Sequence, residues 1–292
     1  MAAKGKQYHA RSAQQPVPFA LRALRLSFAV LGPVFPGLMG RWAYRLWFRT
    51  RRYPASAAGR RAVDRAVRET LRVDTLPVAV YFWGAGPVVL FVHGWSGRGS
   101  QVAAFCEPLV RAGFQVIAVD APGHGESPGN RTNILECVRV VQALDHRYGP
   151  VFGAITHSFG GMVLAYAMNH GTRIERVVCI SPPAHIDFLV DRFTQALAIP
   201  AAVVAELHRL LDQRFEKNSR EQMSTTENVR QLDSPALIIH DEDDVGVPWQ
   251  QGELVANAWP GARFLKTRGL GHGRILRDPE TVRAVVDFIT RG

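Results

Sequence analysis

The sequence predicts an α/β fold built on a mostly parallel, doubly wound sheet. From about residue 77 onward, short apolar segments rich in β-branched residues alternate with longer segments of helical periodicity. This alternation is typical of βαβ units, whose parallel strands are buried on both faces. Turns that carry polar residues and glycine follow several of the strands. Because open α/β sheets bind ligands beyond the carboxyl ends of their strands, we expect the functional residues in these turns.

The expected elements follow one another in regular order. Strands are predicted at 77–83, 88–93, 115–120, 151–156, 176–181, 236–240 and 263–267. Helices are predicted at about 100–112, 133–147, 159–169, 249–258 and 278–290. A helical insertion at about 183–233, rich in Phe, Leu, Ile and Val, interrupts the pattern.

Positive charge is concentrated in the first quarter of the chain. Residues 1–75 contain 15 Lys and Arg residues against three acidic ones, a net charge of +12, whereas residues 76–292 contain 20 basic and 22 acidic residues, a net charge of −2. A nucleic-acid enzyme needs basic surface near its chemistry, so this distribution argues against nucleic acid as a partner. We expect residues 1–75 to form a basic, partly helical extension and residues 76–292 to form the α/β domain.

The extension contains an apolar run that is too short to span a membrane. The run covers residues 26–40, is interrupted by Pro33 and Pro36, and falls short of the ~20 residues a spanning helix needs. No small-residue cleavage site follows it directly, which argues against a cleaved signal peptide. A second amphipathic helix is predicted over 60–72.

After this run, four arginines share one helix face beside aromatic residues: Arg41, Arg45, Arg49 and Arg52. One interpretation is peripheral contact with an anionic membrane through residues 17–53. The other is a helix that packs its aromatic side chains on the main domain and leaves its arginines in solvent.

The chain has three cysteines, Cys106, Cys137 and Cys179. Each lies in an apolar segment and none has C-x-x-C spacing, which indicates buried thiols in a reducing, cytoplasmic compartment.

A candidate nucleophile lies after the strand at 151–156. The segment Thr156-His157-Ser158-Phe159-Gly160 matches the G-x-S-x-G pattern of a strained strand-to-helix turn except at its first residue. Threonine at that position is β-branched, so we expect neighbouring glycines to absorb some crowding. A serine hydroxyl needs a base to remove its proton, and that base needs a carboxylate to orient it.

Further motifs occur at the ends of other strands. They are His93-Gly94-Trp95, the segment Asp120 to Ser127, the acidic run Asp241 to Asp244, and Gly271-His272-Gly273. In their order and position these motifs and the Ser158 turn resemble the α/β-hydrolase superfamily, in its small esterase-like branch. The resemblance covers residues 77–292.

The resemblance implies a catalytic triad in the chain order Ser, acid, His. Ser158 would be the nucleophile and His272 the base, since His272 alone follows the acidic run. Asp244, four residues before Pro248, would be the acid, with Asp243 as the alternative. The remaining acids would be solvent-facing turn residues, or would add negative potential near His272 and raise its pKa.

The resemblance also implies an oxyanion hole and a reaction. The backbone N–H groups of Trp95 and Phe159 would bind the oxyanion, and the insertion at 183–233 would cap the site. We expect a cofactor-free serine hydrolase that cleaves a carboxylic ester with an apolar acyl or alcohol group through an acyl-enzyme. Acyl transfer, thioester or C–C bond hydrolysis on the same triad remain alternatives, as does a non-catalytic binding protein.

Two other histidines lie near these motifs. We expect His93 to support the neighbouring loop by hydrogen bonding, and His124 to be a turn residue. No histidine and acid spacing in the sequence predicts a metal site.

Overall fold

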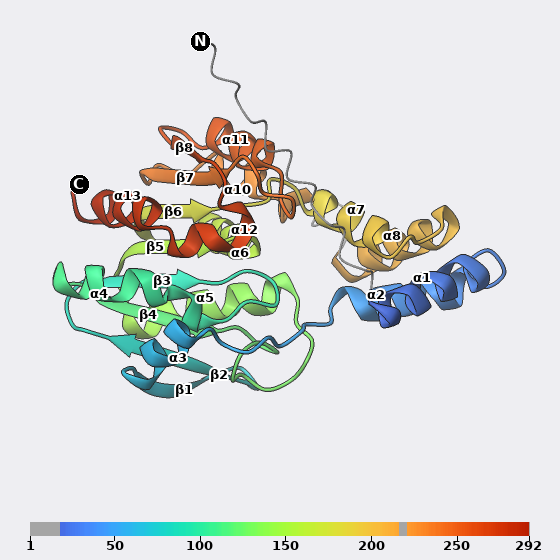
Figure 1. The fold of residues 1–292 in the computed structure, drawn as a ribbon, viewed down its shortest axis with the longest axis horizontal. Helices are drawn as coiled ribbons and strands as arrows, with labels where there is room; N and C mark the ends of the chain where they lie inside the picture. Colours follow the sequence, from blue (N-terminus) through green and yellow to red (C-terminus); the bar gives the residue numbers. More distant parts are fainter. Residues whose placement is uncertain (1–17, 216–220, 292) are drawn as a thin grey trace, which may run out of the picture.

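The computed structural model describes residues 18–215 and 221–291, which form a twisted sheet covered by helices and a helical lobe at one end (Figure 1). The sheet has eight strands in the order β1-β2-β4-β3-β5-β6-β7-β8. They are β1 (Val67–Val73), β2 (Leu76–Trp83), β3 (Val88–Val92), β4 (Gln115–Asp120), β5 (Val151–His157), β6 (Ile174–Ile180), β7 (Ala236–Asp241) and β8 (Arg263–Thr267). The β1/β2 and β2/β4 pairs are antiparallel and all pairs from β4 to β8 are parallel, which confirms the predicted fold class.

The central strands are buried on both faces. Along β3, Val88, Leu90 and Val92 face one apolar core, and Val89 and Phe91 face the other. This alternation follows from the two-residue period of a strand. The first core is closed by α5 (Ile134–Tyr148), α6 (Phe159–Asn169), α10 (Thr225–Val229) and α11 (Trp249–Ala258). The second is closed by α3 (Ala57–Asp64), α4 (Ala103–Arg111) and α13 (Pro279–Thr290).

The helix predicted over 60–72 is wrong for its second half. Helix α3 ends at Asp64, and β1 begins at Val67 and pairs with β2. Apolar residues recur every four positions in this segment, but Leu71 and Val73 also alternate as strand residues and are buried against the sheet. Pairing with the free edge of β2 prevails over the weak helical pattern. The sheet therefore includes a strand that lies before residue 76, where we placed the start of the α/β domain.

The N-terminal helices pack on the insertion and not on the sheet. Helices α1 (Phe19–Leu31) and α2 (Pro36–Trp47) join α7 (Ile186–Ala196) and α8 (Ala201–Phe215) in a lobe with its own core. Within it, Phe28 stacks on Trp42 with ring centroids 5.0 Å apart, and Trp47 meets Phe193 edge-on at 5.3 Å. The aromatic residues of the extension thus contact the insertion of the main domain, which agrees with the packing alternative.

The lobe lies beyond the carboxyl ends of the parallel strands (Figure 1). The segment after α2 ties it to the loops that follow β3 and β4. Thr50 donates its backbone N–H to Asn130 O at 2.9 Å and its hydroxyl to Gly123 O at 2.7 Å, and the backbone N–H of Arg51 donates to Ser96 Oγ at 3.0 Å. Within residues 18–215 and 221–291, no helix is both long and apolar enough to cross a membrane.

Candidate active site

Ser158 occupies a strained turn between the central strand β5 and helix α6. Its backbone has φ 52° and ψ −125°, a conformation that non-glycine residues seldom adopt. Such strain persists only where the surroundings hold it. Here the Ser158 N–H donates to Ile180 O at 2.8 Å, and the Gly161 N–H donates to Ser158 O at 2.9 Å. The turn therefore lifts the serine side chain out of the sheet at its carboxyl edge.

The glycines around this turn allow very close packing. A Cβ on Gly160 would lie 2.2 Å from Val92 O, and a Cβ on Gly94 would lie 2.9 Å from Ser158 Cβ. Thr156, which replaces the first glycine of the pattern, is fully buried and donates its hydroxyl to Val178 O at 3.3 Å. A Cβ on Gly161 would already lie 3.3 Å from that hydroxyl, so this glycine makes room for the threonine.

His272 and Asp244 form a hydrogen-bonded pair at the ends of the last two strands. His272 Nδ1 lies 2.7 Å from Asp244 Oδ2, and the imidazole is about a third exposed. The other carboxylate oxygen of Asp244 accepts the N–H groups of Gly246 at 2.8 Å and Val247 at 2.9 Å. Because Asp244 is an ionised acceptor here, Nδ1 of His272 carries the proton and Nε2 is free to act as a base.

A second histidine, His240, also contacts the carboxylate of Asp244. His240, fully buried at the end of β7, donates Nε2–H to Val247 O at 2.8 Å and also lies 3.5 Å from Asp244 Oδ2. Burial acts to raise the pKa of Asp244, but its hydrogen bonds to His240 and His272 outweigh this and hold that pKa well below its ordinary value. Asp244 therefore stays ionised at neutral pH. The sequence analysis did not single out His240.

Two other acids of the run hold the histidine loop, and for Asp241 this corrects the expectation of a solvent-facing residue. Asp241 is fully buried and accepts the backbone N–H groups of Leu270 at 3.1 Å and Gly271 at 2.7 Å. Asp243 Oδ2 accepts the Gly269 N–H at 2.9 Å and makes no contact with the imidazole that the structure records. Glu242 and Asp243 are both exposed, and Glu242 pairs with exposed Lys266.

The loop is also fixed from the side of the serine. His157 is buried, and its Nε2 lies 2.9 Å from the backbone oxygen of His272, to which it donates. Burial, with the nearby His272, lowers the pKa of His157 to about 3, so this ring is neutral. The structure thus brings Ser158, Asp244 and His272 to one edge of the sheet. No hydrogen bond joins the hydroxyl of Ser158 to the ring of His272 in the structure.

Two backbone N–H groups beside Ser158 are free to bind an anion. Trp95 follows β3 and Phe159 opens α6, and their rings meet edge-on with centroids 5.2 Å apart. Neither backbone N–H donates a hydrogen bond to another group in the described ranges. Unpaired N–H groups on two adjacent loops are the arrangement that stabilises a developing oxyanion.

Both nearby histidines position this loop. His124 Nε2 accepts the Ser96 N–H at 2.9 Å, and His93 Nε2 accepts the Ala121 N–H at 3.0 Å. Burial lowers the pKa of His93, and burial with the neighbouring His93 lowers that of His124 to about 4. Both rings are therefore neutral acceptors. His124 does more than fill a turn, because it fixes the residue that follows Trp95.

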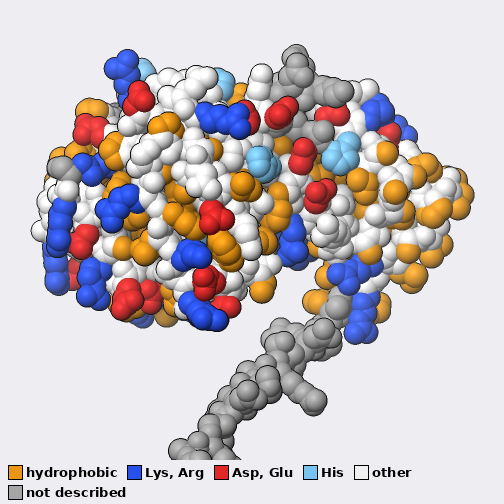
Figure 2. Space-filling model, turned by 90° about the horizontal axis from the view of Figure 1, so that it is seen from above, with side chains coloured by type: hydrophobic (Ala, Val, Ile, Leu, Met, Phe, Trp, Pro, Cys, Tyr) orange, Lys and Arg blue, Asp and Glu red, His pale blue; other side chains and the backbone are white. Residues whose placement is uncertain are grey.

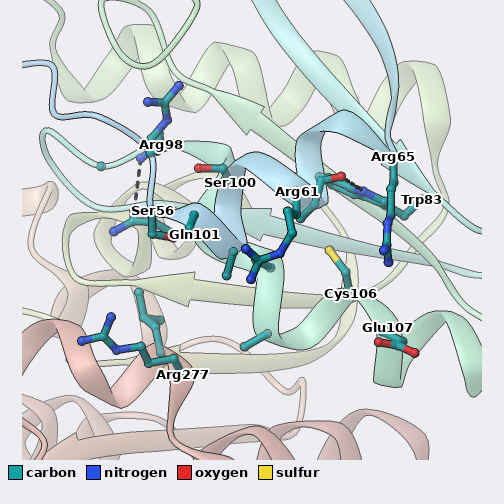
Figure 3. Close-up of a pocket in the computed structure, with 18 of the residues that line it drawn as sticks. Ser56, Arg61, Arg65, Trp83, Arg98, Ser100, Gln101, Cys106, Glu107 and Arg277 are labelled. Carbon is teal, nitrogen blue, oxygen red and sulfur yellow. Dashed lines mark hydrogen bonds between the residues drawn. The ribbon is translucent and has the colours of Figure 1, made fainter.

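A wide groove of about 1350 Å³ lies between α3, α4 and the segment after His272, and Ser96 to Arg98 of the loop after β3 also line it (Figure 3). Arginines line it, among them Arg61, Arg98 and Arg277. It contains neither Ser158 nor His272, so we do not assign the reacting bond to it.

Among the described residues, no three His, Cys, Asp or Glu side chains are grouped so that they could hold a metal ion. Cys106, Cys137 and Cys179 are buried free thiols, and burial raises the pKa of each to about 12.

Comparison with known proteins agrees with this geometry. Residues 89–285 match the model of the "Alpha/beta hydrolase family". The chain is 27% identical over 230 residues to lysophosphatidylserine lipase ABHD12 of Xenopus tropicalis, covering 70% of this chain and 57% of the relative. It is 24% identical over 264 residues to a non-heme haloperoxidase of Rhodococcus erythropolis, covering 71% of this chain and 93% of the relative. The chain thus spans little more than half the length of the lipase.

Solved structures share the fold at low identity. A bromoperoxidase from Bacillus anthracis superimposes with a TM-score of 0.59 at 18% identity, over 77% of this chain and all of that one. The thioesterase domain from the curacin biosynthetic pathway superimposes with a TM-score of 0.55 at 15% identity, over 78% and 99% of the two chains. Since the family model covers most of the sheet and its turns, this chain belongs to the alpha/beta hydrolase family.

Proposed function

We propose that this hydrolase cleaves a carboxylic ester with Ser158 as nucleophile, His272 as base and Asp244 as the acid that orients the base. The observation that carries the proposal is the His272–Asp244 hydrogen bond of 2.7 Å at the sheet edge where Ser158 stands on its strained turn. A neutral imidazole with Nδ1–H held by a carboxylate presents an unprotonated Nε2, which is what activation of a serine requires.

The reaction would proceed in two balanced steps. The Ser158 oxygen attacks the ester carbonyl as His272 Nε2 takes its proton, and the N–H groups of Trp95 and Phe159 bind the oxyanion. The tetrahedral intermediate collapses, the alcohol leaves with the proton from His272, and an acyl-enzyme remains. Water then attacks the acyl carbon, with His272 again as base, and releases the acid and the free serine. Asp244 stabilises the imidazolium in both steps.

The substrate-free geometry is compatible with this sequence of steps. Catalytic hydrogen bonds are often long before substrate binds, so the missing Ser158–His272 bond does not argue against the pair. We keep an apolar acyl or alcohol group as the proposed substrate from the composition of the insertion alone, because its buried apolar side chains pack into the core of the lobe. The lipase relative supports an ester substrate, and the thioesterase neighbour shares only the fold.

The match to a non-heme haloperoxidase, which covers nearly all of that relative, favours a second candidate. In perhydrolysis, hydrogen peroxide replaces water in the second step and the acyl-enzyme yields a peracid. The same three residues would serve, so peracid formation from an ester and added peroxide separates the candidates.

Intact-mass spectrometry after treatment with a fluorophosphonate tests the nucleophile. We expect one adduct on the wild type and none on Ser158→Ala, because only an activated serine displaces the fluoride. A series of p-nitrophenyl esters graded by acyl length then measures the substrate preference. Absence of an adduct on folded wild-type protein would reject the proposed triad and favour a binding protein on this fold.

A further inference from the structure

The outer face of the helical lobe exposes large apolar side chains. On α1, Phe19, Leu26 and Val30 are exposed by 59–86%. Their spacing of seven and four residues places them on one side of the helix. Leu24 and Phe28, on the opposite side, pack into the core of the lobe. Within the described residues, the core of the lobe thus covers one side of α1, and the apolar side chains on its other side have no covering partner.

The same apolar face continues through the turn into α2. Val34 and Phe35 in the turn are exposed by 66% and 53%, and Leu38 and Trp42 on α2 by 61% and 36%. Of the 13 large hydrophobic residues that are exposed in the described ranges, eight lie between Phe19 and Trp42. Scattered exposed apolar residues are ordinary, but a cluster of this size marks an interaction site. In Figure 2, hydrophobic side chains gather at the end of the molecule that this lobe forms.

Arginines adjoin this face without acidic neighbours in sequence. Residues 18–53 contain seven arginines and no acidic residue. Arg41 and Arg45 are exposed on α2 and follow Leu38 on the same side of the helix, so the surface changes from apolar to basic along α2. One acidic residue of a neighbouring helix, Glu206 of α8, packs against Gly40 of α2, but its carboxylate is paired with Arg209.

We propose that this face, formed by α1, the turn after it and the first half of α2, docks the protein peripherally on an anionic lipid bilayer. Apolar side chains would enter the boundary between headgroups and acyl chains, and the arginines would remain at the level of the phosphates. A second copy of the chain fits this face less well. A symmetric contact through it would bring arginines of both copies together with no acidic residue on these helices to offset them.

Docking in this way has a consequence for the site. The lobe lies beyond the carboxyl ends of the strands, on the same side as Ser158 (Figure 1). A bilayer bound to α1 and α2 would therefore hold the proposed ester site close to the lipid. The binding itself does not depend on the proposed reaction, so it is tested with the Ser158→Ala protein.

Sedimentation with lipid vesicles tests the proposal directly. Full-length Ser158→Ala protein should sediment with vesicles of 70% phosphatidylcholine and 30% phosphatidylserine, and less with phosphatidylcholine alone. Adding Val34→Glu and Leu38→Glu should weaken binding by about tenfold or more, because charge cannot enter the acyl region. Adding Val67→Glu and Leu254→Glu, which alter exposed apolar residues elsewhere, should leave it unchanged.

A second variant separates charge from apolar insertion. Arg41→Gln with Arg45→Gln should weaken binding to the anionic vesicles by roughly 25-fold and leave binding to neutral vesicles unchanged, since each basic residue near the surface contributes roughly fivefold. Failure of the parent protein to bind anionic vesicles would overturn the proposal, as would equal binding by the Val34→Glu, Leu38→Glu variant. A dimer in solution that this variant dissociates would assign the face to a second copy instead.

Discussion

Replacing Asp241 by asparagine should destabilise the protein, although Asp241 is not one of the proposed reacting groups. Its Oδ1 accepts the N–H groups of Gly271 at 2.7 Å and Asp243 at 3.0 Å. Its Oδ2 accepts the Thr267 hydroxyl at 2.7 Å and the Leu270 N–H at 3.1 Å. All four partners are donors, so this fully buried position requires an acceptor at both oxygens.

The size of the effect follows from these four contacts. Asparagine keeps one acceptor oxygen and turns an NH₂ group toward the Thr267 hydroxyl and the Leu270 N–H. The hydroxyl can rotate and accept from the NH₂ group, but the Leu270 N–H cannot, so this hydrogen bond is lost. Hydrogen bonds to charged groups contribute about 1.5–3 kcal/mol each, which predicts a loss of about 1.5–3 kcal/mol from this bond alone. That is a substantial part of the ~5–15 kcal/mol by which domains are stable.

The stability that the Asp241 carboxylate contributes should decrease as the pH falls. Burial acts to raise the pKa of Asp241, but hydrogen bonds from Gly271, Thr267 and Leu270 lower it below its ordinary value. The carboxylate therefore contributes stability above pH ~4, where the unfolded chain is also ionised, and this contribution is lost as the pH falls through the folded pKa. The Asp241→Asn protein should lack that part of the acid sensitivity.

Urea unfolding followed by tryptophan fluorescence measures the loss. Glu242→Gln is the matched control, because Glu242 adjoins Asp241 in the chain but its side chain forms only surface ion pairs, at 3.3 Å with Lys266 and 3.9 Å with Arg268. Such pairs contribute at most about 1 kcal/mol. If Asp241→Asn unfolds at the same urea concentration as Glu242→Gln, the carboxylate does not hold the loop and the reasoning fails. If it folds, its kcat should also fall, since the loop carries His272.

Three further predictions rest on single contacts. Asp244→Asn should lower kcat on the order of 10⁴-fold by favouring the wrong tautomer of the base, whereas Asp243→Asn should lower it by less than about tenfold; steady-state ester kinetics decides between the two acids. Because His124 is neutral down to about pH 4 in the folded state, its protonation on unfolding should lower the free energy of unfolding by about 3 kcal/mol between pH 6.5 and 4, beside the contributions of His93 and His157. Urea titrations of His124→Gln should show a fall that is smaller by this amount. Gly160→Ala should prevent soluble expression or abolish fluorophosphonate labelling, because the added Cβ would lie 2.2 Å from the carbonyl oxygen of Val92 in β3. Gly37→Ala is the control: no atom lies within 4 Å of its added Cβ, so it should behave as the wild type in both assays.

The elements with strong local periodicity were predictable from the sequence. The predicted bounds of α6, α11 and β8 agree with the structure, because each is a long helical pattern or a short strand bounded by turn residues. β1 was missed because an exposed edge strand with mixed polar residues has no distinctive local pattern, and only its pairing with β2 stabilises it. The packing of α1 and α2 on the insertion joins segments more than 140 residues apart in the chain, and no local pattern encodes such a contact.

The acidic run shows where prediction by spacing ends. The resemblance to the α/β hydrolases implied Asp244, four residues before Pro248, and the structure places Asp244, and not Asp243, against His272. The roles of Asp241 and Asp243 depend instead on the parallel pairing of β7 with β8, in which Asp241 lies opposite Thr267. This register brings the loops that follow both strands to the same level, so backbone N–H groups of one loop face carboxylates of the other. Such groups must be satisfied when they are buried, which explains why the buried carboxylate of Asp241 binds the backbone of the histidine loop. Asp243 also accepts a backbone N–H of that loop, but it stays exposed to solvent.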